Sequence, residues 1–123
     1  MTSLRERARS LLASREQVEA SEERADALTV AGRTPIAELP DRRRAVATGV
    51  LRSVTLRPRE GVPALVAELY DGSGSLDLVW LGRREIAGIV PGRRLVVEGM
   101  VTRLEGRRAL FNPRYQLKAR PGE

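Results

Sequence analysis

The amino-acid sequence predicts a small all-β domain with one flanking helix in front of it. From residue 45 to residue 118, short runs that alternate apolar and polar residues are separated by Gly or Pro turns, at the spacing expected of a small barrel. Residues 1–28 instead repeat apolar positions every seven residues, as a helix does. A chain of 123 residues is long enough to form one domain with its own core.

Residues 1–28 are expected to form the flanking helix. Its apolar repeat consists of Leu4, Leu11, Val18 and Ala25. Arg15 falls on the same side and makes the stripe thin. Three alternatives stay open for such a polar helix: it is mobile and lies loosely on the barrel, it pairs with another chain, or it frays. Residues 29–44 follow as a linker that ends in a basic arm, Arg42–Arg44.

Five β-like runs follow the linker. They are Ala45–Leu56, Val62–Tyr70, Ser75–Leu81, Arg94–Leu104 and Arg108–Leu117. In the first run Val46, Val50 and Val54 share one face, and Gly49 is expected to permit a bend or bulge. The segment 71–74, Asp-Gly-Ser-Gly, predicts a hairpin turn, and Pro113 interrupts the last run.

A connecting helix is expected between the third and fourth runs. The segment 82–89 is too short and too charged for a strand, and its Ile86 and Ile89 are expected to plug one end of the barrel. Three strands, a short helix and two strands is the element order of the five-stranded OB-fold β-barrel. The main alternative, an SH3-like barrel, usually lacks a helix at that point. Residues 45–118 are therefore predicted to be the OB-fold domain, followed by a tail, 119–123.

The charge is unevenly distributed along the chain. The formal net charge is +6, but residues 1–28 hold five arginines against six acidic residues. The excess of positive charge thus follows residue 28, which points to a polyanion partner for the barrel. Nearly all of the cations are arginines, a bias that a GC-rich genome explains as well as phosphate binding does.

The composition argues against an enzyme. The sequence has no cysteine and no histidine, which removes the commonest metal ligands and the commonest general base, and no nucleotide-binding glycine motif is present. We therefore expect no catalytic residues, no cofactor and no metal. The first ten residues lack the apolar region of a secretory signal, and no apolar run is long enough to span a bilayer, so a cytoplasmic protein is expected.

An OB-fold usually binds its ligand across the second and third strands, between the loops that join strands 1–2 and 4–5. These loops carry the candidate cations Arg57, Arg59, Arg103, Arg107 and Arg108. The candidate stacking residues are Tyr70, Trp80 and Phe111. Tyr70 is out of phase with its apolar neighbours and is expected to point outward. The alternation of Trp80 with Leu76 and Leu78 also fits a core residue, and Phe111 fits either position.

Four segments resemble an OB-fold family. The hairpin 69–80, LYDGSGSLDLVW, is similar to that of the wedge domain in RecG-type branch-migration helicases. The segments TPIAEL at 34–39, VPGRRLVVEG at 90–99 and GRRALFNPRY at 106–115 resemble the same domain in the same order. The likeness covers about residues 34–117 and includes no motor motif. The chain as a whole resembles the short stand-alone OB-fold proteins of actinobacteria. The resemblance implies nucleic-acid binding.

The sequence thus predicts a nucleic-acid-binding OB-fold module that uses loop arginines and limited base stacking. Single-stranded or junction DNA is the expected partner, more than RNA. The alternative is a protein-interaction adaptor that uses the N-terminal helix and the barrel edge. Self-association through Leu4, Leu11 and Val18 is a third reading.

Overall fold

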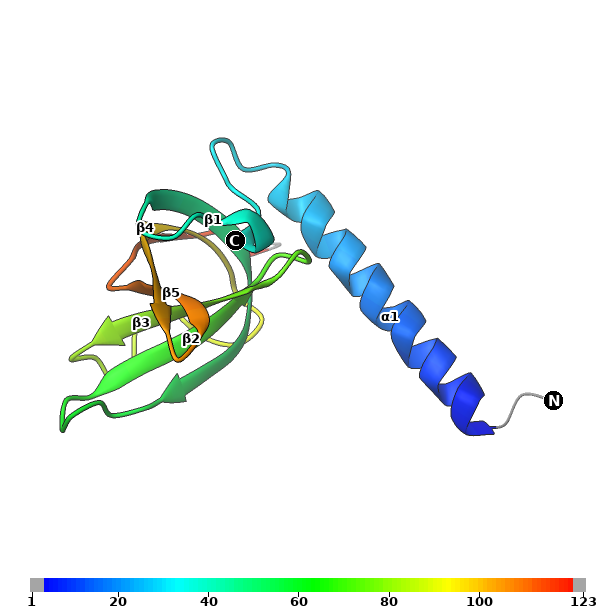
Figure 1. Ribbon diagram of the computed structural model, residues 1–123, viewed down its shortest axis with the longest axis horizontal. Helices are drawn as coiled ribbons and strands as arrows, with labels where there is room; N and C mark the ends of the chain where they lie inside the picture. Colours follow the sequence, from blue (N-terminus) through cyan, green and yellow to red (C-terminus); the bar gives the residue numbers. More distant parts are fainter. Residues whose placement is uncertain (1–3, 121–123) are drawn as a thin grey trace.

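A computed structural model describes residues 4–120 as a closed β-barrel from which one long helix projects (Figure 1). In chain order the elements are α1 Leu4–Ala27, the 3-10 turn η1 Ile36–Glu38, and the strands β1 Arg44–Leu56, β2 Ala64–Tyr70, β3 Ser75–Leu81, β4 Arg94–Leu104, β5 Arg107–Phe111 and β6 Arg114–Leu117. The ends of the predicted helix and tail, residues 1–3 and 121–123, lie outside the described residues.

The barrel closes because β1 serves two neighbours. Its first half, Arg44–Val50, pairs antiparallel with β4, and its second half, Val50–Leu56, pairs antiparallel with β2. β2 and β3 are antiparallel, β3 and β5 are parallel, and β5 returns antiparallel to β4. The predicted last strand is divided at Asn112 and Pro113, after which β6 pairs with β4. Closure leaves none of the five barrel strands with a long unpaired edge.

A bend and a bulge allow β1 to turn from one neighbour to the other. Gly49 is required at the bend, because a Cβ there would collide with the backbone carbonyl of Tyr70. The register slips at Arg52, so the predicted bulge lies three residues beyond Gly49. The extra residue reverses the alternation: Ala47 and Leu51 face the core before the bulge and Val54 packs against it afterwards. The predicted shared face through Val46, Val50 and Val54 is therefore wrong.

The core fills the barrel and both of its ends. Its buried residues are Ile36, Leu39, Ala47, Leu51, Leu65, Ala67, Leu69, Leu76, Leu78, Trp80, Ile86, Ile89, Leu95, Val97, Val101 and Leu110. Ile86 and Ile89 are buried as predicted, but the connecting helix is reduced to one turn, in which the Ile89 N–H bonds to the Ile86 carbonyl at 3.0 Å. Gly82, before this turn, and Gly88, inside it, both have positive φ, which explains why no longer helix forms.

Asp71 ties the β2–β3 hairpin to the linker. Its side chain is buried, and Oδ1 accepts hydrogen bonds from the Ser73 N–H at 2.9 Å, the Ser73 hydroxyl at 2.7 Å and the Gly74 N–H at 3.2 Å. Oδ2 accepts the Ile36 N–H at 2.9 Å. The carboxylate thereby closes the hairpin turn and holds η1, whose Ile36 caps the core, against it.

The helix α1 is fastened to the barrel by its last two turns. Arg94 donates to Glu23 at 2.7 Å, Lys118 donates to Asp26 at 3.1 Å, and Ala27 is buried. The earlier turns extend away from the barrel (Figure 1). Within residues 4–120, no helix has the length and apolar content that crossing a membrane requires.

Asp71→Ala is expected to lower the free energy of unfolding by about 3 kcal/mol, because it leaves the buried Ile36 N–H and the turn amides without their acceptor. Ser73→Ala removes the hydroxyl's hydrogen bond to Asp71 and the acceptor of the exposed Ala37 N–H. It should cost less, about 1 kcal/mol, because the Ala37 N–H can bond to water instead. Urea denaturation followed by tryptophan fluorescence measures both. Equal losses for the two variants would show that the buried carboxylate is not the organising group.

Candidate nucleic-acid interface

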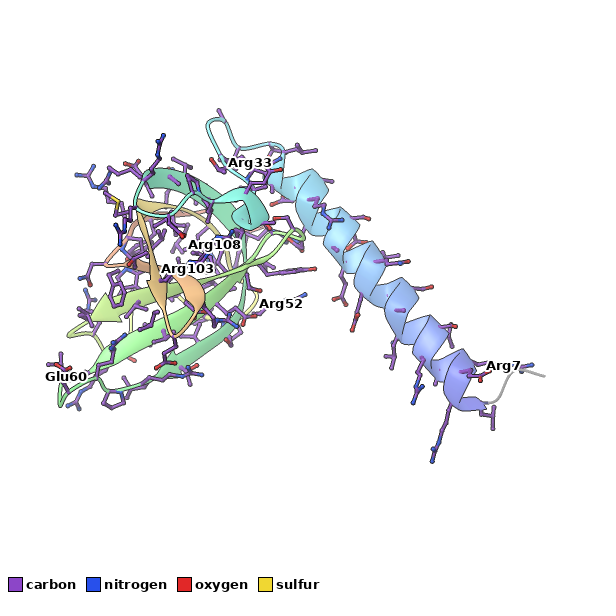
Figure 2. The ribbon with its side chains drawn as sticks, viewed as in Figure 1. Arg7, Arg33, Arg52, Glu60, Arg103 and Arg108 are labelled. Carbon is purple, nitrogen blue, oxygen red and sulfur yellow. The ribbon has the colours of Figure 1, made fainter. Side chains whose placement is uncertain are left out.

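A groove of about 510 Å³ crosses the outer face of β1, β2 and β3. Its floor is formed by Ser53, Thr55, Val66, Glu68 and Asp77. One wall is the β1–β2 loop, residues 57–60, and the other is the β4–β5 turn with Leu104, Glu105 and Arg107. The sequence predicted β2, β3 and both loops for the interface, and β1 is an addition. Figure 2 shows Glu60 at the tip of the first loop, far from α1, so the helix leaves this end of the groove open.

The β1–β2 loop is a tight hairpin that places two arginines on one wall. The Arg57 N–H bonds to the Ala64 carbonyl at 2.8 Å, and Arg59 and Val62 exchange backbone hydrogen bonds of 2.8 Å. Glu60 and Gly61 turn the chain with positive φ. Arg57 and Arg59 are two residues apart, both are exposed and both line the groove. Within residues 4–120 neither guanidinium has an ion-pair partner, so both are available to a ligand.

Arg107 lines the groove but is held by two carboxylates. Its Nε and Nη2 donate to both oxygens of Asp77 at 3.0 and 3.1 Å, and Nη2 also donates to Glu68 at 3.3 Å. The hydrogen bonds and the charge of Asp77, followed by Glu68, raise the pKa of Arg107 above its ordinary value. Glu68 and Asp77 are directly opposite each other in the β2–β3 pair. The cluster has one positive and two negative charges, which makes it a poor phosphate site.

Arg103 and Arg108 do not line the groove, and for these two residues the predicted interface is wrong. Arg108 donates to the carbonyls of Leu39 and Ala37 at 3.2 and 3.3 Å, so it anchors the linker. Arg103 donates to Asp41 at 3.0 Å. The cause is strand alternation: Arg107 and Arg108 are adjacent and point to opposite faces, and Arg103 is the register partner of Arg108.

Phe111 stands on the outer face. It follows the core residue Leu110 and is the register partner of Val79 in the parallel β3–β5 pair. Its ring is partly exposed, and the guanidinium carbon of Arg59 lies 5.5 Å from the ring centroid. The Arg59 side chain thus reaches from the loop across the sheet to β5, forming a cation–π contact. The stack places a partly exposed aromatic ring next to Arg59, one of the groove-lining residues.

Tyr70 also points outward, as predicted, and is partly exposed. The guanidinium carbon of Arg52 lies 3.3 Å from its ring centroid. Arg52 is a functional candidate that the sequence analysis missed, because the bulge that turns it outward depends on β1 pairing with two strands. Tyr70 is outside the groove, four residues beyond Val66 on β2, or about 13 Å along the strand. It lines a second cleft of about 610 Å³ against α1.

Trp80 belongs to the core, so its predicted role as a stacking residue is wrong. Only 5% of its surface is exposed, its Nε1–H donates to the Pro113 carbonyl at 3.3 Å, and Tyr115 packs edge-on against it with centroids 5.7 Å apart. No ring face is left for a base. The alternation with Leu76 and Leu78 was the correct signal, and it indicated the core.

The groove has a mixed charge. Arg57, Arg59 and Arg107 face four lining carboxylates, from Glu60, Glu68, Asp77 and Glu105. The predicted strip of five cations is therefore wrong, since two of them lie elsewhere and a third is neutralised. Within the described residues no group of three ligating side chains is arranged to hold a metal ion. The groove offers hydrogen-bond acceptors on its floor and two cations without ion-pair partners on one wall, and the aromatic rings of Phe111 and Tyr70 lie outside its lining.

Comparisons with known proteins give one informative result. No family model and no curated protein matches the sequence. Among solved structures, the chain is similar to the solution structure of a replication factor A related protein from Methanobacterium thermoautotrophicum, with a TM-score of 0.52, 12% identity, and coverage of 70% of this chain and 90% of that chain. At this identity the likeness establishes the fold alone. The chain is an OB-like barrel with a flanking helix.

Trp80→Ala is expected to lower the free energy of unfolding by about 3–5 kcal/mol, because it empties a core site. Phe111→Ala, which truncates a partly exposed ring on the outer face, should cost clearly less. Chemical denaturation followed by far-ultraviolet circular dichroism measures both variants without relying on the tryptophan signal. A larger loss for Phe111→Ala would mean that Phe111 is a core residue and not a platform.

Proposed function

We propose that this protein is a nucleic-acid-binding module without catalytic activity, and that single-stranded or junction DNA is its preferred partner. The observation that carries the proposal is the groove between the β1–β2 and β4–β5 loops, with the Arg59–Phe111 stack at one end. This is the face on which OB-folds bind oligonucleotides and oligosaccharides. The resemblance of the hairpin 69–80 to RecG-type wedge domains favours DNA. The similarity to a replication factor A related protein supports a nucleic-acid partner in general.

The charge pattern suggests how a strand would lie. Phosphates are repelled from the groove centre, where Glu68 and Asp77 outnumber Arg107. Carboxylate oxygens instead accept hydrogen bonds from the amino groups of bases, as Asp and Glu do with cytosine N4. The strand would therefore enter with its bases towards the sheet and its phosphates towards the rim, where Arg57 and Arg59 are unpaired.

Stacking would supply the affinity that the charge does not. One base would stack on Phe111 beside Arg59, and a second stack is available on Tyr70 beside Arg52. Each base–aromatic stack contributes about 1–3 kcal/mol by alanine substitution. The two rings lie on the same outer face of the sheet, one on β5 and one at the end of β2, so a strand that crosses obliquely from β5 over β3 to β2 would meet both.

Removing the wall cations should weaken oligonucleotide binding more than removing the same charge elsewhere. The double variant Arg57→Ala/Arg59→Ala is expected to raise Kd by about tenfold or more, since it removes both phosphate contacts and one stacking partner. Arg83→Ala/Arg84→Ala is the matched control: it removes two exposed arginines of the β3–β4 connection that do not line the groove. Fluorescence anisotropy with labelled single-stranded, forked and duplex oligonucleotides of DNA and RNA measures Kd. Equal losses in the two double variants would contradict a role for the groove.

The salt dependence should be shallow. Two rim arginines neutralise about two phosphates, which predicts a slope of log Kobs against log salt near −1.4 for single strands. Titrations at several salt concentrations test this value. A slope steeper than about −4 would require many more phosphate contacts and would place the binding surface elsewhere. Absence of binding tighter than about 100 μM at low salt would contradict nucleic-acid binding altogether.

A further inference from the structure

The apolar stripe of α1 faces away from the barrel. Leu4, Leu11 and Val18 are 83%, 67% and 55% exposed. Ala13, Ala20 and Ala27 each follow one of these residues by nine positions, which is two and a half helical turns. The alanines and the large apolar residues therefore lie on opposite sides of the helix. It is the alanine side that faces the barrel.

Three observations identify the alanine side as the one that faces the barrel. Ala27 is buried, a Cβ at Gly72 would collide with the carbonyl of Ala20, and Ala13 lines the cleft against Tyr70. A surface helix normally turns its large apolar residues to the core. In α1 they are presented to solvent instead, while the small side chains allow close approach to the barrel. The stripe is therefore an unpartnered surface on a helix that the barrel already holds.

The charge of α1 is divided between its halves. Residues 4–15 contain four arginines and one glutamate, and residues 16–27 contain five acidic residues and one arginine. A parallel copy of the helix would set like charges side by side. An antiparallel copy sets the basic half of each helix against the acidic half of the other, so the chain is complementary to itself in that orientation.

We propose that the protein forms a weak homodimer through antiparallel pairing of α1. A two-fold axis between Ser14 and Arg15 places Leu11 beside Val18 of the partner subunit, and Leu4 beside the partner's exposed Ala25. The same register sets Arg7 level with the partner's Glu22. Every contact occurs twice, as two-fold symmetry requires.

One feature of the structure favours a second copy as the partner, and another limits the affinity of the dimer. The earlier turns of α1 gain no burial from the barrel, and helices are stabilised mainly by the packing of an apolar face, which a second copy supplies. Arg15 lies on the stripe beside the two-fold axis in both copies, where like charges meet. The interface is thus small, and the two Arg15 side chains repel each other at its centre. Both properties make the dimer weak. This inference does not depend on the nucleic-acid proposal, because α1 leaves the loop end of the groove open.

Sedimentation of the full chain up to about 1 mM is expected to show a monomer–dimer equilibrium that weakens in salt. Leu11→Glu should raise the dimer Kd by at least about tenfold, which corresponds to about 1.4 kcal/mol. Ser10→Glu is the matched control, since it adds the same charge to an exposed position beside the stripe and should leave Kd within about threefold. Arg15→Leu should tighten the dimer. A wild-type chain that stays monomeric throughout the range would overturn the proposal.

Disulfide trapping tests the orientation of the two helices. Because the sequence has no cysteine, the introduced cysteines are the only thiols that can react. Under mild oxidation a mixture of Leu11→Cys and Val18→Cys chains, distinguished by mass tags, should give mainly the mixed 11–18 disulfide. Disulfides form when the two Cα atoms come within about 7 Å, which the antiparallel register permits for this pair. A predominance of 11–11 and 18–18 products would establish a parallel pair and overturn the proposal. Trapping at no more than the rate of a Ser10→Cys control would show that the stripe does not pair.

Discussion

The double pairing of β1 is the constraint on which the rest of the structure depends. One strand of thirteen residues must hydrogen-bond first to β4 and then to β2. A strand cannot do so while it stays straight, because the two neighbours lie on different sides of the closed barrel. Gly49 permits the bend, since no side chain fits beneath the Tyr70 carbonyl, and the bulge at Arg52 restores the inward phase for Val54. The pairing of β1 with two strands therefore explains both the closure of the barrel and the contact between Arg52 and Tyr70.

Arginine content is a poor guide to where this protein binds. The chain beyond residue 28 carries the whole positive excess, yet several of its arginines are held by other parts of the barrel and linker. Arg44, Arg94, Arg103 and Arg107 pair with carboxylates, and Arg108 bonds to linker carbonyls. Exposed ion pairs of this kind contribute little stability individually, but they remove cations from the set that a ligand can use. What remains at the groove is two arginines on one wall, which favours base contacts over phosphate contacts as the main source of affinity.

Local signals predicted the strands well because turns and alternation are local properties. Ser75–Leu81 and Arg94–Leu104 were predicted to the residue, since a glycine or proline turn borders each of them. The phase of β1 was not predictable, because the bulge is required by pairing between segments distant in the sequence. The same limit applies to the site: loop membership placed Arg57 and Arg59 correctly, whereas the face that Arg103 and Arg108 occupy depends on the register of the β4–β5 pair. The pairing of Arg107 with Asp77 and Glu68 is likewise set by tertiary structure.

The two ends of the barrel are specialised for different contacts. At the end near α1, small residues and Asp71 hold the helix and the linker in place: Gly72 accommodates Ala20, and the buried carboxylate fixes η1. At the other end, the loops that carry Arg57, Glu60 and Arg107 enclose an open groove with unpaired cations. A helix that lay across the second end would fill the groove, and a groove at the first end would leave α1 without a support. Because the helix and the groove are at opposite ends, neither covers the other. A domain this small can therefore carry both the outward apolar stripe of α1 and an open groove.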